Sequence, residues 1–177
     1  PQHQHRRIRL GSLGRRVAHA GNGSSRVISI ARPRSAVGEA YRSLRTNLQF
    51  APPETRPKTV LITSPGLGDG KSETTANLAV VLAQTGVRTL VIDADLRRPQ
   101  LHELFGTSHE VGLTSVLVGS AQFRAVVQPT DVETLSLLPA GPLPPNPADL
   151  LGSDRMKEFL AWLKGQYDMI LLDSPPS

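Results

Sequence analysis

A glycine-rich stretch in the first half of the chain has the residue types that bind phosphate groups. Residues 64–72, with the sequence SPGLGDGKS, lie between an apolar run typical of a strand and a run typical of a helix. Such glycines let backbone amides turn inward around phosphate oxygens, and the start of the following helix adds a positive dipole end. Lys71 would reach the β- and γ-phosphates, and the Ser72 hydroxyl would ligate magnesium. The stretch therefore predicts a site for ATP and Mg²⁺.

One residue departs from the usual form of this loop. Pro65 stands where the pattern has a glycine, five residues before Gly70. The strand–loop–helix setting nevertheless favours phosphate binding over a glycine-rich turn without a ligand. The residues predicted to contact the nucleotide are Gly66, Gly68, Asp69, Gly70, Lys71, Ser72 and Glu73.

Three aspartates follow strand-like runs elsewhere in the chain. Asp93 ends the run RTLVID and opens the motif D-x-D-x-R with Asp95, and Asp173 ends the run DMILLD. Ligands bind at the carboxyl ends of the strands in open α/β sheets, so these side chains are expected to converge near the phosphate loop. There, one carboxylate can serve Mg²⁺ through water while another orients the nucleophile.

Each aspartate taken singly has a second interpretation, because a lone aspartate commonly caps the turn that follows it. Two like charges side by side are costly unless a cation lies between them. Arg97 or Arg98 could supply that cation locally, as a metal could. The metal site is therefore predicted from the combination of motifs and not from any one aspartate.

These motifs need a parallel sheet to position them. Strand, glycine loop, helix and strand follow one another within about 35 residues, which predicts a βαβ unit with parallel strands and a right-handed crossover. Ser35 can cap the first helix, and Gly86 can end the second. The expected fold is α/β: a P-loop NTPase-type parallel sheet flanked by helices, truncated after the strand that ends at Asp173 (the Walker B strand). Helices are expected over 36–50, 70–85, 99–105, 114–118 and 148–164, the last with a break near Gly152, and strands over 58–64, 88–93, 134–139 and 168–173.

The charge is distributed unevenly along the chain. The net charge is +5, but residues 1–34 contain eight arginines and no acid, so the remainder is acidic. This predicts a basic, disordered juxtamembrane arm over 1–34 and a folded domain over 35–177. The arm could attract anionic lipid headgroups, bind nucleic acid nonspecifically, or serve only as a solvated linker.

The composition excludes several kinds of site and of protein. The chain contains no cysteine, which excludes disulfides and thiolate metal sites, and it has no apolar run long enough to span a membrane. It begins with Pro1 and stops at Ser177, directly after a strand-like run. We expect it to be a fragment of a longer protein, and to be inactive alone.

Together the motifs resemble the bacterial tyrosine autokinases of polysaccharide export. The resemblance rests on the phosphate loop, the D-x-D-x-R motif with its following Pro99, and the terminal ILLDSPP. The sequence EAYRSLRTNLQF also matches the E-x-x-R-x-x-R element of that family, and the likeness covers residues 36–177. Glu73 departs from the threonine that is usual there. The C-terminal tyrosine cluster of the family is absent from this sequence.

The resemblance implies a role for each motif. Lys71 and Ser72 would hold phosphate and magnesium, and Asp93 would accept the proton of the incoming tyrosine hydroxyl. Asp95 and Asp173 would serve the metal, although these assignments of the aspartates could be exchanged. Catalysis would rest on Lys71, Asp93 and Asp95, and the metal ligands would be Ser72, Asp95 and Asp173.

The same resemblance implies partners and a location. Glu39, Arg42 and Arg45 would dock on the neighbouring subunit of a ring-like homo-oligomer. A transmembrane polysaccharide co-polymerase would activate the kinase, in the same polypeptide or as a separate chain. The substrates would be tyrosine-containing proteins, no specific nucleic acid would bind, and the kinase would act at the cytoplasmic face of the bacterial plasma membrane in capsular or exopolysaccharide synthesis.

Two other functions fit parts of the sequence. A partitioning or division-site ATPase of the same fold would use ATP to switch its dimerisation on DNA or membrane. Such proteins usually carry an extra lysine near the start of the phosphate loop, where this chain has Ser64, Pro65 and Gly66. A nucleotide-binding adaptor without activity is the third possibility, and the complete set of motifs argues against it for the parent protein.

Overall fold

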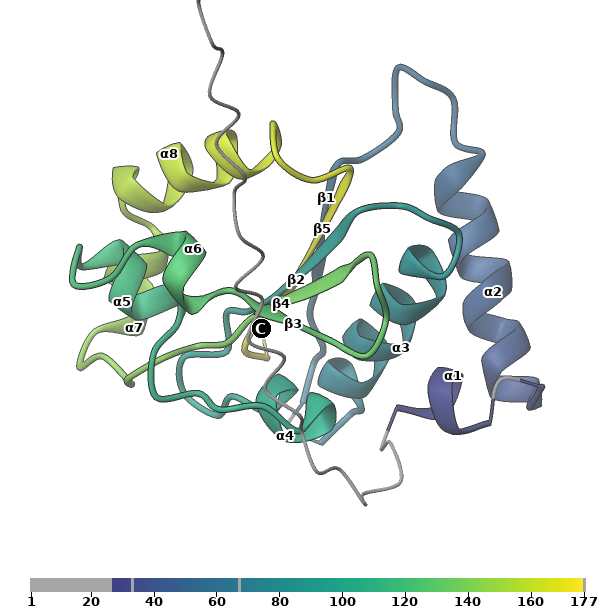
Figure 1. Cartoon of the computed structure of the whole chain (residues 1–177), viewed down its shortest axis with the longest axis horizontal. Coiled ribbons are helices and arrows are strands. Elements are labelled where there is room, and N and C mark those ends of the chain that lie inside the picture. The colour runs from purple at the N-terminus through teal and green to yellow at the C-terminus, as the bar shows by residue number, and fades with distance from the viewer. Residues whose placement is uncertain (1–26, 33, 67, 177) are drawn as a thin grey trace, which may run out of the picture.

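A five-stranded sheet forms the centre of the domain, in the order β1-β5-β2-β4-β3 (Figure 1). The computed structural model describes residues 27–32, 34–66 and 68–176. The first four strands in this order pair in parallel, and β3 pairs with β4 in the antiparallel direction. The predicted parallel sheet is confirmed, with one short antiparallel strand added at its edge. The strands are β1 (Thr59–Ile62), β2 (Thr89–Asp93), β3 (Gln128–Pro129), β4 (Leu135–Leu138) and β5 (Met169–Asp173).

The two central strands, β2 and β5, are buried at every position. Successive side chains of a strand point to opposite faces, so Leu90 and Ile92 pack in one apolar cluster while Val91 packs in the other. Burial on both faces explains why these strands read as continuous apolar runs instead of alternating ones.

The strand predicted over 58–64 is shorter and less buried than expected. β1 lies at the edge of the described sheet, and Val60 and Ile62 pack toward the cluster that contains α3. Leu61 must then point to the opposite face, where it is 61% exposed. The expectation of a buried strand is therefore wrong at this residue, because the helices on that face cover the middle of the sheet and not this edge.

Helices cover both faces of the sheet (Figure 1). On one face α3 packs directly on the strands, with α2 outside it; α5, α6, α7 and α8 gather on the other face. α4 follows β2 and contacts α3. The helices are α1 (Ile28–Ala31), α2 (Ala36–Gln49), α3 (Lys71–Ala83), α4 (Leu101–Phe105), α5 (Leu113–Leu117), α6 (Phe123–Val126), α7 (Pro147–Leu151) and α8 (Asp154–Leu163).

The predicted helix ends are largely confirmed. Ser35 caps α2 by accepting a hydrogen bond from the Gly38 amide at 3.1 Å. Gly86 follows α3 with a φ of +85°, the left-handed conformation that favours glycine. The expected break near Gly152 separates α7 from α8. Pro99, however, precedes α4 and is not in its first turn, and the short elements α6 and β3 were not predicted.

The folded region begins earlier than the boundary predicted at residue 35. Val27 is only 1% exposed and joins the core cluster around α3. The Ser29 amide donates to Asn77 Oδ1 of α3 at 2.7 Å, so α1 is fixed to the domain by a buried hydrogen bond. Disorder is thus the wrong prediction for residues 27–32. The prediction rested on the arginine content of the whole arm and overlooked a short apolar segment within it. Residues 1–26 of the predicted arm lie outside the described residues.

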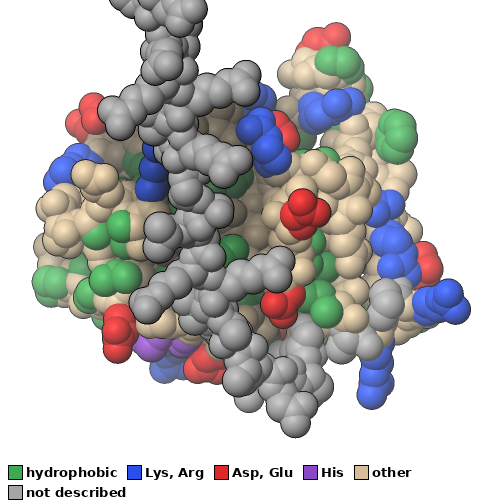
Figure 2. All heavy atoms as spheres, in the orientation of Figure 1, with side chains coloured by type: hydrophobic (Ala, Val, Ile, Leu, Met, Phe, Trp, Pro, Cys, Tyr) green, Lys and Arg blue, Asp and Glu red, His purple; other side chains and the backbone are tan. Residues whose placement is uncertain are grey.

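The surface of the described part carries both signs of charge. Figure 2 shows basic and acidic side chains interspersed on one face, outside the area that grey atoms cover. Among the described helices, none is both long and apolar enough to cross a bilayer.

Candidate active site

The phosphate loop connects β1 to α3 at the carboxyl edge of the sheet. Gly68 and Gly70 adopt φ angles of +81° and +77°, which residues with a Cβ rarely adopt, so the turn that exposes the loop amides requires glycine there. The loop borders a pocket of about 310 Å³. The pocket is lined by Ser64, Gly66, Gly68, Asp69, Gly70, Lys71, Ser72, Asp95, Arg98, Gln100 and Pro176.

Lys71 lies between two of the predicted carboxylates. Its Nζ is 3.3 Å from Asp95 Oδ2 and 3.8 Å from Asp173 Oδ1, and its side chain is only 10% exposed. The ammonium group is therefore the cation that makes two neighbouring acids tolerable here. For the neighbouring pair Asp93 and Asp95 the sequence had offered Arg97 or Arg98 as the cation. In the structure it is the backbone amides of both arginines that contact Asp95 Oδ1, at 3.2 and 2.9 Å.

Asp173 connects the last strand to the start of α3. Its carboxylate accepts hydrogen bonds from Ser72 Oγ at 2.5 Å and from Thr75 Oγ1 at 3.2 Å. Burial raises the pKa of Asp173, and the bonds from Ser72 and the charge of Lys71 oppose that rise. Sequence reasoning missed Thr75, although its position one turn after Lys71 on the same helix was a usable signal.

Asp93 lies beside Asp173 in the sheet register, yet it does not line the pocket. It is fully buried, and its Oδ2 accepts hydrogen bonds from the amides of Gln100 and Leu101 at 3.1 and 3.0 Å. Within the described residues, its Oδ1 has no hydrogen-bond partner. Burial, with the neighbouring charge of Asp173, raises the pKa of Asp93 to about 7.

Two further loop acids were predicted to contact the nucleotide. Asp69 lines the pocket, and its Oδ2 accepts a hydrogen bond from the Gly66 amide at 2.9 Å. Glu73 is exposed in the first turn of α3 and does not line the pocket. The structure therefore places the other predicted nucleotide contacts and Asp95 in the pocket lining. Glu73, Asp93 and Asp173 lie outside this lining, although Asp173 contacts both Lys71 and Ser72.

The predicted oligomer residues lie on α2, away from the pocket. Glu39 and Arg42 form an ion pair with each other along the helix, and hydrogen bonding to Arg42 lowers the pKa of Glu39. Arg45 instead turns toward α3, where its guanidinium donates to the Val81 carbonyl at 3.4 Å. Glu39 and Arg42 are thus on the outer surface, whereas Arg45 is part of the packing between α2 and α3.

Comparison with known proteins identifies the family. A family model described as an AAA domain matches residues 58–177. Tyrosine-protein kinase YwqD of Bacillus subtilis is 47% identical over 150 residues, which cover 85% of this chain and 63% of that protein. The chain belongs to the bacterial tyrosine kinases. Against the kinase domain of the Escherichia coli tyrosine kinase Etk, this family member gives a TM-score of 0.82 at 36% identity, covering 92% of the chain and 64% of that domain.

A more distant likeness extends to a division-site protein. The septum site-determining protein MinD of Pyrococcus horikoshii, solved with Mg-ADP, is 32% identical with a TM-score of 0.58, and the match covers 68% of the chain and 49% of MinD. The tyrosine-kinase likeness is therefore both closer and more extensive. The chain spans about 63% of the length of YwqD, so it corresponds to part of such a kinase.

The residues of the site suit a magnesium nucleotide. The described residues contain no ready cluster of three or more histidine, cysteine or acidic side chains that would hold a metal by itself. Magnesium is usually bound by one or two carboxylates with water and substrate phosphates, and Ser72 with Asp173 provides such a partial set of hard oxygen donors. The geometry therefore fits a metal that arrives with its nucleotide.

Proposed function

We propose that the protein containing this chain is an ATP-dependent protein-tyrosine autokinase that regulates capsular or exopolysaccharide synthesis and export. The observation that carries the proposal is that Lys71, Ser72 and Asp95 line one pocket at the carboxyl edge of the sheet, where Asp173 contacts both Lys71 and Ser72. The similarity to YwqD and to the kinase domain of Etk supports tyrosine as the acceptor.

Nucleotide binding would rearrange the charges seen in the pocket. The loop amides and Lys71 would hold the phosphates, and Ser72, Asp95 and Asp173 would serve the magnesium ion. A magnesium ion held there would supply positive charge that offsets the negative charge developing on the phosphate oxygens during transfer. In this structure the charge of Lys71 neutralises Asp95 and Asp173. With Mg·ATP bound, the metal would neutralise these carboxylates instead, and Lys71 would contact the phosphates.

The transfer step itself needs little covalent chemistry from the protein. The acceptor tyrosine oxygen attacks the γ-phosphorus in line, and the bond from that phosphorus to the β–γ bridging oxygen breaks, releasing ADP. The phenolic proton passes to a carboxylate. Asp93 fits this role chemically, because a pKa of about 7 suits a general base near neutral pH and its Oδ1 has no partner.

A tyrosine hydroxyl cannot reach Asp93 in this structure, which counts against Asp93 as the base. The side chain is fully buried beneath the segment that leads into α4, so this segment would have to move before a hydroxyl could reach it. Asp95, which lines the pocket, is the alternative base. Loss of a base should lower kcat about a hundredfold or more with nucleotide affinity retained, whereas loss of a metal ligand should weaken Mg·ATP binding. Asp93→Asn and Asp95→Asn in the full-length protein separate the two roles.

The partners are proposed on the family resemblance. Exposed Glu39 and Arg42 would contact the next subunit of a ring, with Arg45 supporting α2 from beneath. A transmembrane co-polymerase would place the kinase at the cytoplasmic face of the plasma membrane, and its protein substrates would carry tyrosines. We propose no specific nucleic acid as a partner.

The deciding experiment uses the full-length protein with Mg·ATP and detection of phosphotyrosine. We expect phosphotyrosine to accumulate in the wild type and to be lost in Lys71→Met. Release of inorganic phosphate with no phosphotyrosine would instead favour an ATPase switch like the division-site proteins. Nucleotide binding without turnover of either kind would favour an adaptor.

A further inference from the structure

A second hollow of about 340 Å³ adjoins the phosphate pocket. It is lined by Asp95, Arg97, Arg98, Pro175 and Pro176. Asp95, Arg98 and Pro176 line both hollows, so the two are continuous. A molecule in the second hollow, which we call the arginine–proline groove, would therefore lie next to phosphates held by the loop.

The two arginines of the groove carry charges that the described part of the protein does not neutralise. Both side chains are exposed, and no described carboxylate forms an ion pair with either. By contrast, exposed Arg88 forms an ion pair with Asp168, and partly buried Arg42 forms one with Glu39. The groove therefore presents two positive charges that are available to a ligand.

The backbone beneath these charges is held in place. Asp95 Oδ1 accepts hydrogen bonds from the amides of Arg97 and Arg98, and Asp95 Oδ2 faces Lys71. The one acid of the groove is thus occupied on both oxygens and is only 2% exposed, so it repels an incoming anion little. A positioned pair of guanidinium groups is well suited to a carboxylate or phosphate.

Two prolines supply the apolar part of the groove lining. Pro175 and Pro176 are partly buried, and the Pro175 carbonyl accepts hydrogen bonds from Thr63 Oγ1 at 3.2 Å and Ser174 Oγ at 3.1 Å. Proline rings held in this way offer a flat apolar surface on which an aromatic ring can pack. The groove thus combines a surface for a ring with cations for an anionic group.

We propose that the arginine–proline groove is the acceptor subsite, and that it selects tyrosines with an acidic or already phosphorylated residue beside them. The proposal rests on the proposed kinase function and deepens it. The acceptor ring packs on Pro175 and Pro176 while the neighbouring carboxylate or phosphate pairs with Arg97 and Arg98. A phosphate added to one tyrosine then favours binding of the segment for transfer to the next.

The test measures binding and phosphorylation of short tyrosine peptides by the full-length kinase. The peptides carry two glutamates, two glutamines, two lysines or one phosphotyrosine beside the acceptor, and binding is measured by fluorescence anisotropy with a non-hydrolysable ATP analogue. We expect the glutamate and phosphotyrosine peptides to bind about tenfold more tightly than the glutamine peptide. The lysine peptide should bind most weakly.

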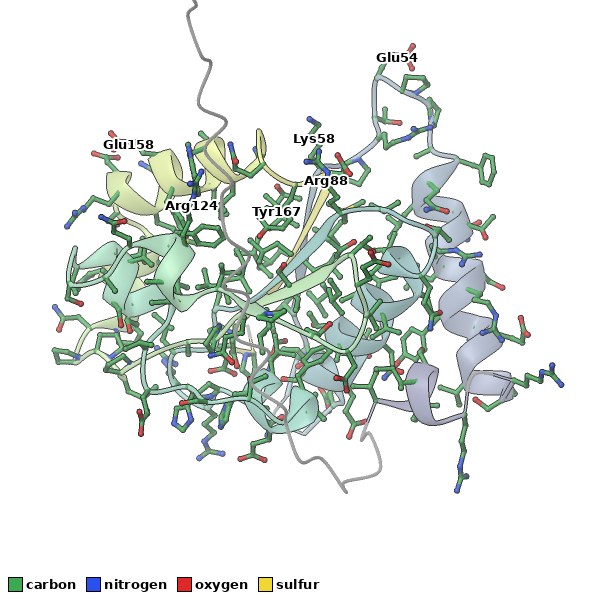
Figure 3. The ribbon with its side chains drawn as sticks, viewed as in Figure 1. Glu54, Lys58, Arg88, Arg124, Glu158 and Tyr167 are labelled. Atoms are coloured by element: carbon green, nitrogen blue, oxygen red, sulfur yellow. The ribbon has the colours of Figure 1, made fainter. Side chains whose placement is uncertain are left out.

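Arg97→Gln is the decisive variant, because Arg97 lines only the groove whereas Arg98 also lines the phosphate pocket. The preference for acidic peptides should fall about tenfold in Arg97→Gln, with nucleotide affinity retained. Arg124→Gln is the matched control: Figure 3 shows Arg124 pointing toward α8, far from α4, and this exposed change should leave the preference intact.

The outcomes separate the subsite from the activity. Equal binding of the glutamate and lysine peptides, or an unchanged preference in Arg97→Gln, overturns the subsite. A preference that depends on Arg97 but comes with no phosphate transfer to any peptide supports the subsite and contradicts the kinase function.

Discussion

Lys71 neutralises two carboxylates in the nucleotide-free structure and would bind phosphates in the complex, so one side chain has two electrostatic tasks. Lys71→Met removes both. We expect Mg·ATP affinity to fall about a hundredfold, equivalent to about 2.7 kcal/mol, when it is measured by isothermal titration calorimetry. The free protein should also lose about 3 kcal/mol of stability in chemical unfolding, because a buried ion pair loses one partner.

The control for this change is Lys58→Met, just before β1. Lys58 is exposed, and its Nζ only approaches the Lys164 carbonyl at 3.5 Å. Figure 3 shows this side chain at the opposite end of the sheet from α4. Nucleotide affinity and stability should both be retained. If Lys71→Met binds nucleotide as tightly as Lys58→Met, the loop does not hold phosphates as proposed.

The raised pKa of Asp93 predicts how stability depends on pH. The folded carboxyl has a pKa of about 7 against an ordinary value of 3.8, so the folded state holds a proton that the unfolded chain releases in this range. The contribution of the protonated Asp93 carboxyl to the free energy of unfolding is therefore lost as pH rises from about 4 to 7. Asp93→Asn removes this dependence, and its stability relative to wild type should grow by about 3 kcal/mol from pH 5 to pH 8.

The measurement is urea unfolding without nucleotide or metal at the two pH values. Asp168→Asn serves as the comparison. Pairing with Arg88 lowers the pKa of Asp168 below 3.8, so its contribution changes only at more acidic pH and its difference from wild type should be constant between pH 5 and pH 8. A constant difference between Asp93→Asn and wild type across this range would mean that Asp93 is ionised when folded.

At this scale, the sequence predicted which residues meet but not how they pair. Residue types and spacing were sufficient for Lys71 and Ser72, because a strand–loop–helix unit constrains them, and for Asp173, because it ends a parallel strand at the same edge of the sheet. They were insufficient for Asp93 and Asp95. The two residues are two apart at a strand end and both are buried, and the path of the following chain decides that Asp95 lines the pocket and Asp93 does not.

At the scale of elements, α1 is the clearest addition to what the sequence predicted. Its contribution can be measured with Val27→Ala, because Val27 is 1% exposed within the core cluster. Removing two buried methyl groups and leaving a small cavity should cost about 2 kcal/mol in thermal or chemical unfolding. Val37→Ala on α2 is the control, since Val37 is 46% exposed and its truncation should change stability by less than about 0.5 kcal/mol. Equal effects would mean that residues 27–32 do not pack on the domain.

Apolar runs made most elements predictable, including the four-residue strands β1 and β4, whereas three short elements were not predicted. The strands β2 and β5 are continuous apolar runs, and the second half of α3 is apolar, so local patterns identify them. By contrast, α1, α6 and β3 are each four residues or fewer. Elements of this length are stabilised by the surface on which they pack, as the Ser29–Asn77 hydrogen bond illustrates, and not by their own propensity.

For the whole molecule, binding of nucleotide should couple to folding. The pocket is lined by the start of α3 and by residues of the segments that follow β1, β2 and β5, so only the folded chain can bind. At a Mg·ATP concentration a hundredfold above Kd, the free energy of unfolding of the full-length kinase should rise by about 2.7 kcal/mol, detected as a higher Tm. Chelating magnesium should remove most of this gain, and Lys71→Met should show almost none. A Tm that does not respond to Mg·ATP in the wild type would contradict the proposed site.

The position of β5 has a consequence for how the protein is made. β5 is the last of the five strands in the chain but lies between β1 and β2 in the sheet, and it is the strand partner through which β1 joins the described sheet. During synthesis on the ribosome, β1 therefore cannot pair with its neighbouring strand until residues 169–173 have emerged. The same segment delivers Asp173 to Ser72, so the nascent chain should gain affinity for nucleotide only when this last insertion is complete.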